Sequence, residues 1–246
     1  MKPIYLKLSV PLDKLAAGSS RFWGNPDLPE DFDFPLYTDE EGEEYDYVFV
    51  CQINLEELAN FGVPTILPKK GLLSFFTKID HYMGYYDVPM DINGCVSDRN
   101  AVRVLYFPTC KGMVEKVLVG DDDEPIVPHE LRIDFTYNIS PLSDDRALFV
   151  PPTHCPWETW DEPYEDRKIL LQIDSFEGDD FSLNFMDCGV LDFLVSPSDL
   201  KRQCFDNIRA IVFQHRTFDV NISYIYIRSI RNQITNSNSN KKYICC

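Results

Sequence analysis

Residues 49–54 read FVCQIN and are followed by GLLSFF at residues 71–76, while residues 170–174 read LLQID and are followed by GVLDFL at residues 189–194. In both places a short apolar run ends in Gln-Ile and a polar residue, and a glycine opens the next apolar run. Short runs rich in β-branched and aromatic residues are typical of strands. We therefore predict two copies of one strand pair that pack against the same core.

These two strand pairs predict an internal pseudo-repeat, with modules of about residues 21–80 and 155–205 that merge into one body. Other short apolar segments, bounded by Pro, Gly, Asn and Asp, continue the strand pattern along the chain. Several alternate apolar and polar residues, which favours antiparallel sheet with one wet face. The predicted strands are Tyr47–Ile53, Gly71–Thr77, Ala101–Phe107, Met113–Val119, Leu131–Tyr137, Ile169–Ile173, Val190–Val195, Ile208–Phe213 and Val220–Ile227.

Two segments carry the signals of a helix start. Asn54 is a capping residue with acids in the following turn, and Ser196 is followed by Pro197 and Asp199. The predicted fold class is therefore α+β: sheet-rich, with mostly antiparallel strands and a few short helices. We predict a single domain over residues 1–231 and a flexible polar tail over residues 232–246, whose few apolar residues cannot offset the entropy of ordering.

The chain is strongly acidic, with a net charge of -17 from 40 acidic and 23 basic residues. Phosphate backbones and anionic membrane surfaces repel such a protein, so we expect neither nucleic acid nor membrane as a partner. A basic protein is the natural complement. The alternative is that the acidity only keeps the protein soluble.

The acids are concentrated in residues 22–68, which contain twelve acidic residues and no Lys or Arg, whereas residues 199–246 carry eight basic residues against three acidic ones. Self-repulsion should keep Thr38–Asp46 an exposed loop. This loop is either a docking surface for a basic protein or only a solvated hairpin tip. The candidate partner-binding residues are Asp39, Glu40, Glu41, Glu43 and Glu44.

Residues 21–35 read RFWGNPDLPEDFDFP, and their prolines force extended neighbours. The segment is either a strap stapled across a sheet edge or the rim of a binding cleft. In the second interpretation the cleft lies between the two modules. Its candidate ligand-binding residues are Trp23, Asn25, Gln52 and Gln172.

Familiar catalytic and metal-binding spacings are missing from the sequence. The histidines, His81, His129, His154 and His215, form no HExxH motif, and no CxxC pair is present. The eight cysteines are irregularly spaced, and we expect reduced thiols, with Cys51 and Cys188 in the core. We predict no metal site, no cofactor and no catalytic residue.

The first ten residues alternate apolar and polar positions, and Lys7 interrupts them, which suits a strand better than a secretory signal. No later segment approaches the roughly 20 apolar residues of a membrane span. We therefore expect a cytoplasmic protein.

Several motifs together are similar to those of the YwqG-like family. They are RFWGNPDLPEDFDFP at residues 21–35, FVCQINLEEL at 49–58, LPKKGLLSFF at 67–76 and LNFMDCGVLDFLVS at 183–196. The resemblance extends over roughly residues 4 to 215. Asn25 and Phe34 depart from the glycine and tryptophan that the family often has. The resemblance implies a sheet-rich α+β fold and a bacterial-type cytosolic protein, with no established activity. Some relatives are encoded beside polymorphic toxin systems, which suggests a role in toxin immunity.

The leading functional prediction is a non-enzymatic acidic protein-interaction module, related to toxin immunity. The alternative is a small-molecule-binding protein or enzyme with a cleft between the two modules. A deep polar pocket would favour the alternative, and a flat acidic surface without one would favour the interaction module.

Overall fold

The computed structural model describes residues 2–39, 41–62, 64–78, 95–119, 127–138, 146–151, 160, 163–177, 182–183, 185 and 189–214. All of them belong to one compact unit, Met1–Gln214, while the second unit, His215–Cys246, lies wholly outside the described residues. The predicted strand Val220–Ile227, the domain boundary at residue 231 and the tail at 232–246 therefore also lie outside them.

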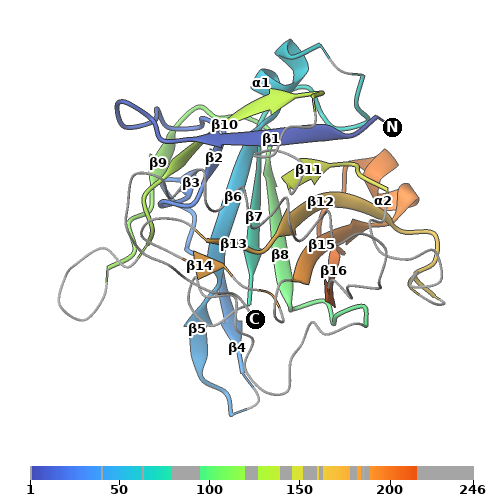
Figure 1. Ribbon diagram of the computed structural model, residues 1–246. Helices are drawn as coiled ribbons and strands as arrows, with labels where there is room; N and C mark the ends of the chain where they lie inside the picture. Colours follow the sequence, from blue (N-terminus) through green and yellow to red (C-terminus); the bar gives the residue numbers. More distant parts are fainter. Residues whose placement is uncertain are drawn as a thin grey trace, which may run out of the picture. The chain divides into compact units, whose positions relative to one another are not determined.

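The main element is a ten-stranded sheet in the order β16-β15-β12-β11-β1-β10-β2-β6-β7-β8, and every neighbouring pair in it is antiparallel (Figure 1). Within the described ranges, three two-stranded pairs, β3-β9, β4-β5 and β13-β14, accompany it. The strands are β1 Ile4–Ser9, β2 Arg21–Phe22, β3 Asp27–Pro29, β4 Leu36–Thr38, β5 Glu44–Asp46, β6 Val48–Asn54, β7 Leu72–Thr77, β8 Val102–Phe107, β9 Met113–Glu115, β10 Leu131–Thr136, β11 Arg146–Leu148, β12 Lys168–Asp174, β13 Phe176–Glu177, β14 Ser182–Leu183, β15 Gly189–Val195 and β16 Arg209–Gln214. The predicted sheet-rich, antiparallel architecture is confirmed.

The helices among the described residues are short, as predicted. They are α1 Leu55–Asn60, whose first turn is capped by the Asn54 side chain, and α2 Pro197–Arg202, capped by Ser196. In both, the capping oxygen accepts backbone N–H groups that have no partner within the helix. Neither described helix is long and apolar enough to cross a bilayer.

The sheet curls into a nearly closed barrel, so that its edge strands β8 and β16 approach each other (Figure 1). The Ser97 amide donates to the Ala210 carbonyl oxygen at 2.8 Å, and the Ala210 amide donates to Ser97 Oγ at 2.9 Å. Apolar side chains from both halves of the sheet fill the interior, where the rings of Phe75 and Phe193 lie 5.2 Å apart. The Cys51 side chain is completely buried in this core, as predicted, whereas Cys188 lies outside the described residues.

The strand pairs β6-β7 and β12-β15 have the same internal geometry. In the first pair Gln52 lies opposite Ser74, and in the second Gln172 lies opposite Asp192. A register shift occurs at the same distance before each glutamine, between Phe49 and Cys51 and between Ile169 and Leu171. The strand on the other side of each pair, β2 beside β6 and β11 beside β12, is followed directly by a residue with positive φ, Trp23 in one case and Phe149 in the other.

Three sequence-based expectations need correction. Thr38–Asp46 is not all loop, because its ends pair as β4 and β5. The strand predicted at Met113–Val119 ends at Glu115, since its partner β3 is only three residues long. The strap at residues 21–35 does not cross a sheet edge: Arg21–Phe22 form β2 within the sheet, and the later residues cross the outer face of β6 and β7, with Leu28 packed against Phe49 and Phe76.

Candidate functional site

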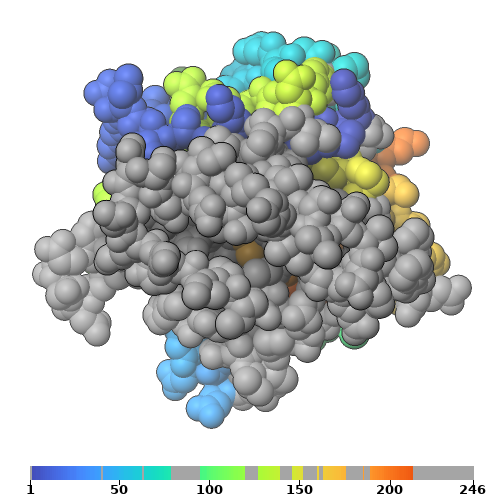
Figure 2. Space-filling view, viewed as in Figure 1, coloured from blue at the N-terminus to red at the C-terminus, as the bar shows by residue number. Residues whose placement is uncertain are grey.

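The β4-β5 hairpin is the most exposed regular element within the acidic window, and it projects from the end of β6 opposite α1 (Figure 1). Figure 2 shows its atoms in blue, protruding at the bottom of the view. All three residues of β5 are exposed. Leu36 and Tyr45 keep 49% and 47% of their surface in solvent, which is high for large apolar side chains. The hairpin therefore combines apolar anchors with carboxylates, a combination typical of binding surfaces.

Asp39 has a structural role at the tip of this hairpin. Its Oδ1 accepts the backbone N–H groups of Glu41 and Glu43, both at 2.9 Å, and its own amide donates to the Glu43 carbonyl oxygen. Such side-chain capping is how aspartate stabilises turns. Asp39 thus shapes the tip, while Glu41, Glu43 and Glu44 remain exposed; Glu40 lies outside the described residues.

The face of the hairpin that carries Tyr37 and Tyr45 is aromatic. Tyr45 stacks on Tyr37 with ring centroids 5.6 Å apart, and Tyr37 contacts Tyr47 edge-on at 5.2 Å. The carboxylate of Asp39, together with burial and the charges of Glu43 and Glu41, raises the pKa of Tyr45. The pKa of this phenol therefore reports the negative potential of the hairpin tip.

A shallow groove of about 210 Å³ begins at Leu36 and continues along the strap. It is lined by Phe32, Asp33, Phe34, Pro35, Leu36, Arg103 and Leu105. Small-molecule sites are usually larger, roughly 300–1,000 Å³. The groove and its aromatic lining escaped the sequence analysis, although the alternation of Phe32 and Phe34 with acidic residues was a visible signal.

Gln52 and Asn25 are parts of a buried polar network beneath the strap. Arg21 Nη2 lies 2.7 Å from Asp27 Oδ2, and both side chains are 1% exposed. Gln52 Nε2 donates to the same oxygen at 2.6 Å, while Gln52 Oε1 accepts the Asp27 amide at 3.0 Å. Asn25 Oδ1 accepts the Leu118 amide at 3.1 Å. These contacts anchor the strap to the sheet, and no sequence spacing had indicated this Arg–Asp pair.

Trp23 packs in the main core and is completely buried, with its ring 4.9 Å from that of Phe22. Gln172 is also buried, and four strands separate β12 from β6, so the structure does not bring Gln52 and Gln172 together. In the described part of the chain, none of these three side chains lines an open cleft. That Trp23 and the two glutamines bind a ligand stays a prediction.

The second half of the sheet carries buried carboxyl groups where the first half carries neutral side chains. Asp192 is 1% exposed and lies opposite Gln172, where β7 has Ser74 opposite Gln52. Gln172 Oε1 and Asp192 Oδ1 find no hydrogen-bond partner among the residues that the structure describes. Burial, and then the charge of nearby Asp174, raise the pKa of Asp192 well above its usual value.

Changing Asp192→Asn is expected to flatten the pH dependence of stability. Because the folded-state pKa is raised, the folded protein retains a proton that the unfolded chain releases above about pH 4. The contribution of Asp192 to the free energy of unfolding is therefore greatest below that pH and is lost as the pH rises toward the folded-state pKa. The stability of the variant relative to wild type should grow by about 1.4 kcal/mol per pH unit over this window. Urea unfolding at several pH values measures it. Equal pH dependence in both proteins would contradict the prediction, and exposed Asp13→Asn is the control.

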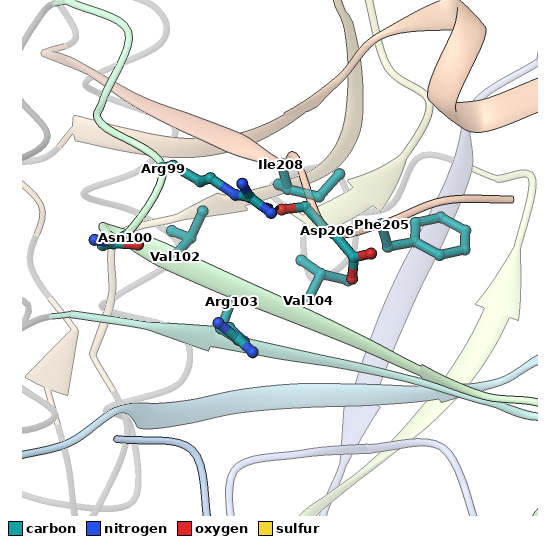
Figure 3. Close-up of a pocket in the computed structure, with 8 residues that line it drawn as sticks. All are labelled: Arg99, Asn100, Val102, Arg103, Val104, Phe205, Asp206 and Ile208. Carbon is teal, nitrogen blue, oxygen red and sulfur yellow. Dashed lines mark hydrogen bonds between the residues drawn. The ribbon is translucent and has the colours of Figure 1, made fainter. Parts of the chain in front are cut away.

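A second hollow, of about 110 Å³, lies at the seam between β8 and the segment that leads into β16 (Figure 3). Arg99 reaches across the seam, and its Nε donates to the Asp206 carbonyl oxygen at 3.1 Å. Val102 and Val104 project from one face of β8, and Arg103 projects from the other. This hollow is too small for a typical ligand. The residues that line it serve mainly to connect the two edges of the sheet.

Metal and thiol chemistry find little support in the described part of the chain. No group of three or more His, Cys, Asp or Glu side chains there is arranged to hold a metal. Burial raises the pKa of the Cys51 thiol far above its ordinary value, which makes this thiol unreactive. The other motif residues that the sequence raised, His81, His154, His215 and Cys188, lie outside the described residues.

A family model for a domain of unknown function matches residues 20–148 and 140–212. The chain belongs to this family, DUF1963. The two matches together contain the strap, the acidic hairpin and all the described strands except β1 and the last two residues of β16. No curated protein matches this DUF1963 chain. The match therefore identifies the part of the chain that forms the family's domain, and the description of the family gives no reaction.

Proposed function

We propose that this DUF1963 protein is a non-enzymatic interaction module that binds a basic protein through the β4-β5 hairpin. The observation that carries this proposal is the exposed hairpin itself. Glu41, Glu43 and Glu44 lie on it beside the half-exposed Leu36 and Tyr45. Complementary charge would raise the association rate, and the apolar anchors would supply most of the affinity.

The small size of the hollows also favours this proposal over a small-molecule site. Both described hollows are smaller than typical ligand pockets, and the polar groups of Gln52 and Asn25 are engaged within the protein. The YwqG-like motifs support placing the chain among the YwqG-like members of DUF1963. From them we extend the proposal to a cytoplasmic protein whose basic partner is a toxin.

The test is a pull-down with mass spectrometry at low and high salt. The triple variant Glu41→Gln, Glu43→Gln, Glu44→Gln should lose partners that wild type retains at low salt. A matched control neutralises three exposed carboxylates elsewhere: Asp13→Asn, Glu165→Gln and Asp166→Asn. Equal partner recovery by both triple variants would overturn the hairpin as the contact surface. Binding that persists unchanged at high salt would overturn electrostatic attraction.

We also propose that the sheet consists of two five-stranded repeats, which extend the predicted modules. Matching registers in β6-β7 and β12-β15 support this. The Trp23 amide donates to Val50 O and the Phe149 amide to Leu170 O, which are equivalent positions. When equivalent strands of the two repeats are given the same name, the strand order reads the same from either edge of the sheet. The register of the central β1-β10 pair is symmetric about the Lys7–Asp134 pair. In an experimental structure, the strands β1, β2, β6, β7 and β8 should superpose on β10, β11, β12, β15 and β16 in this alignment. A better fit in a shifted alignment would remove the proposal.

A further inference from the structure

The face of the hairpin that adjoins the groove has a defined order of side chains. In β4-β5, Leu36 lies opposite Asp46, and Thr38 lies opposite Glu44. Because alternate residues of a strand share a face, these four side chains lie on the same face of the hairpin. From the groove toward the tip, a binding segment would meet apolar surface first, then Asp46, then Glu44.

The groove is open and is apolar in its middle. Phe32, Phe34 and Leu105 surround the half-exposed Leu36, and the volume of about 210 Å³ suits an inserted side chain. Asp33 and Arg103 line the groove as well, and both are exposed. Because their charges are opposite, the charged residues that line the groove give it no net charge, and the carboxylates of the hairpin remain the nearest unbalanced charges.

The two carboxylates on this face are available to a cation. Neither Glu44 nor Asp46 forms an ion pair with any residue in the described ranges. Partial burial raises the pKa of Asp46, which means that water solvates this carboxylate incompletely. A positively charged group placed beside it would relieve that cost.

We propose that the groove and hairpin together bind an extended segment of the partner, with a large apolar side chain followed by basic residues at the second and fourth positions beyond it. The apolar side chain fills the groove beside Leu36, and the basic side chains reach Asp46 and Glu44. Residues two apart in an extended chain are separated by about 7 Å, which matches the spacing along β5. The inference rests on the proposed function and adds the sequence pattern of the partner.

Fluorescence polarisation with the full-length chain and labelled synthetic peptides tests the pattern. One peptide carries Leu with Lys at the second and fourth positions beyond it, and it is made in both chain directions. A second, with the same composition, has Lys at the first and third positions. A third has Ser in place of Leu, and a fourth has Glu in place of Lys. The first peptide, in one direction, should bind about tenfold more tightly than the second or third, and the fourth should not bind.

Two variants on the protein side complete the test. Leu36→Ser should reduce the preference for the peptide with Leu, and Glu44→Gln with Asp46→Asn should abolish the preference for Lys in the correct register. Leu12→Ser, which changes a fully exposed leucine outside the groove, is the control and should leave binding unchanged.

The outcomes separate this inference from the function on which it rests. If basic peptides bind in a salt-sensitive way but equally well in either register and without Leu, the groove inference is overturned and the interaction module stands. If basic peptides bind no better than the acidic one, the proposed function fails together with the inference. A clear register preference that Leu36→Ser removes supports both.

Discussion

Arg21→Met is expected to destabilise the protein by about 3–5 kcal/mol, because it leaves the buried carboxylate of Asp27 without its cation. Arg21 also donates to Glu130 Oε2 at 2.9 Å and to the Asn25 carbonyl oxygen at 3.3 Å, so the strap loses several attachments at once. Urea unfolding monitored by circular dichroism measures the change in the free energy of unfolding. The midpoint should fall while the slope stays constant.

Two controls show whether the buried charge is the cause. Arg21→Met combined with Asp27→Asn removes the stranded charge but keeps an oxygen for the Gly18 amide and the Gln52 side chain. This double variant should recover at least half of the lost stability. Arg132→Met breaks an exposed ion pair with Asp134 and should cost less than about 1 kcal/mol. A double variant as unstable as Arg21→Met alone would contradict the buried-charge explanation.

Gly71→Ala is expected to cost about 2–5 kcal/mol, from an unfavourable backbone conformation and from overpacking. Gly71 precedes β7 and has φ of +96°, and an added Cβ would lie 2.1 Å from the Phe107 carbonyl oxygen of β8. Backbone cannot move aside as a flexible side chain can, so the end of the β7-β8 pair must open. The change in the free energy of unfolding is again the measurement.

Gly62→Ala is the matched control for this substitution. Gly62 has a similar φ of +84°, but nothing lies within 4 Å of the added Cβ. It should cost only the conformational part, about 1–2 kcal/mol. If the two variants lost equal stability, the close approach to Phe107 would have no energetic role.

Local patterns predicted the strands and helix starts well, because their causes are local. The Asn54 and Ser196 caps depend only on neighbouring amides, and the alternation at Leu131–Thr136 depends only on which face is buried. The ends of β9 could not be predicted, since they depend on the short partner β3. Likewise the acidic loop was expected to repel itself, but Asp39 uses its carboxylate to close the turn.

The features of the candidate site also differ in whether the sequence could predict them. The exposure of Glu41, Glu43 and Glu44 followed from their density of charge, because a run of carboxylates cannot be desolvated cheaply. The groove did not follow, because it joins the strap to Arg103 and Leu105 of β8, far away in the chain. Such a surface exists only after strands distant in sequence have paired.

By itself, the sequence determined the antiparallel, sheet-rich class, the capped helices and the acidic hairpin, since each depends on side chains and neighbours within a few residues. Only the tertiary structure decided that Gln52 holds the strap through Asp27, that Asp192 is buried opposite Gln172, and that an apolar groove meets the hairpin at Leu36. The physical reason is that burial and pairing are properties of contacts between distant segments. The glutamine of the Gln-Ile motif is therefore hydrogen-bonded to the strap in one half of the sheet, whereas in the other half it lies opposite a carboxyl group.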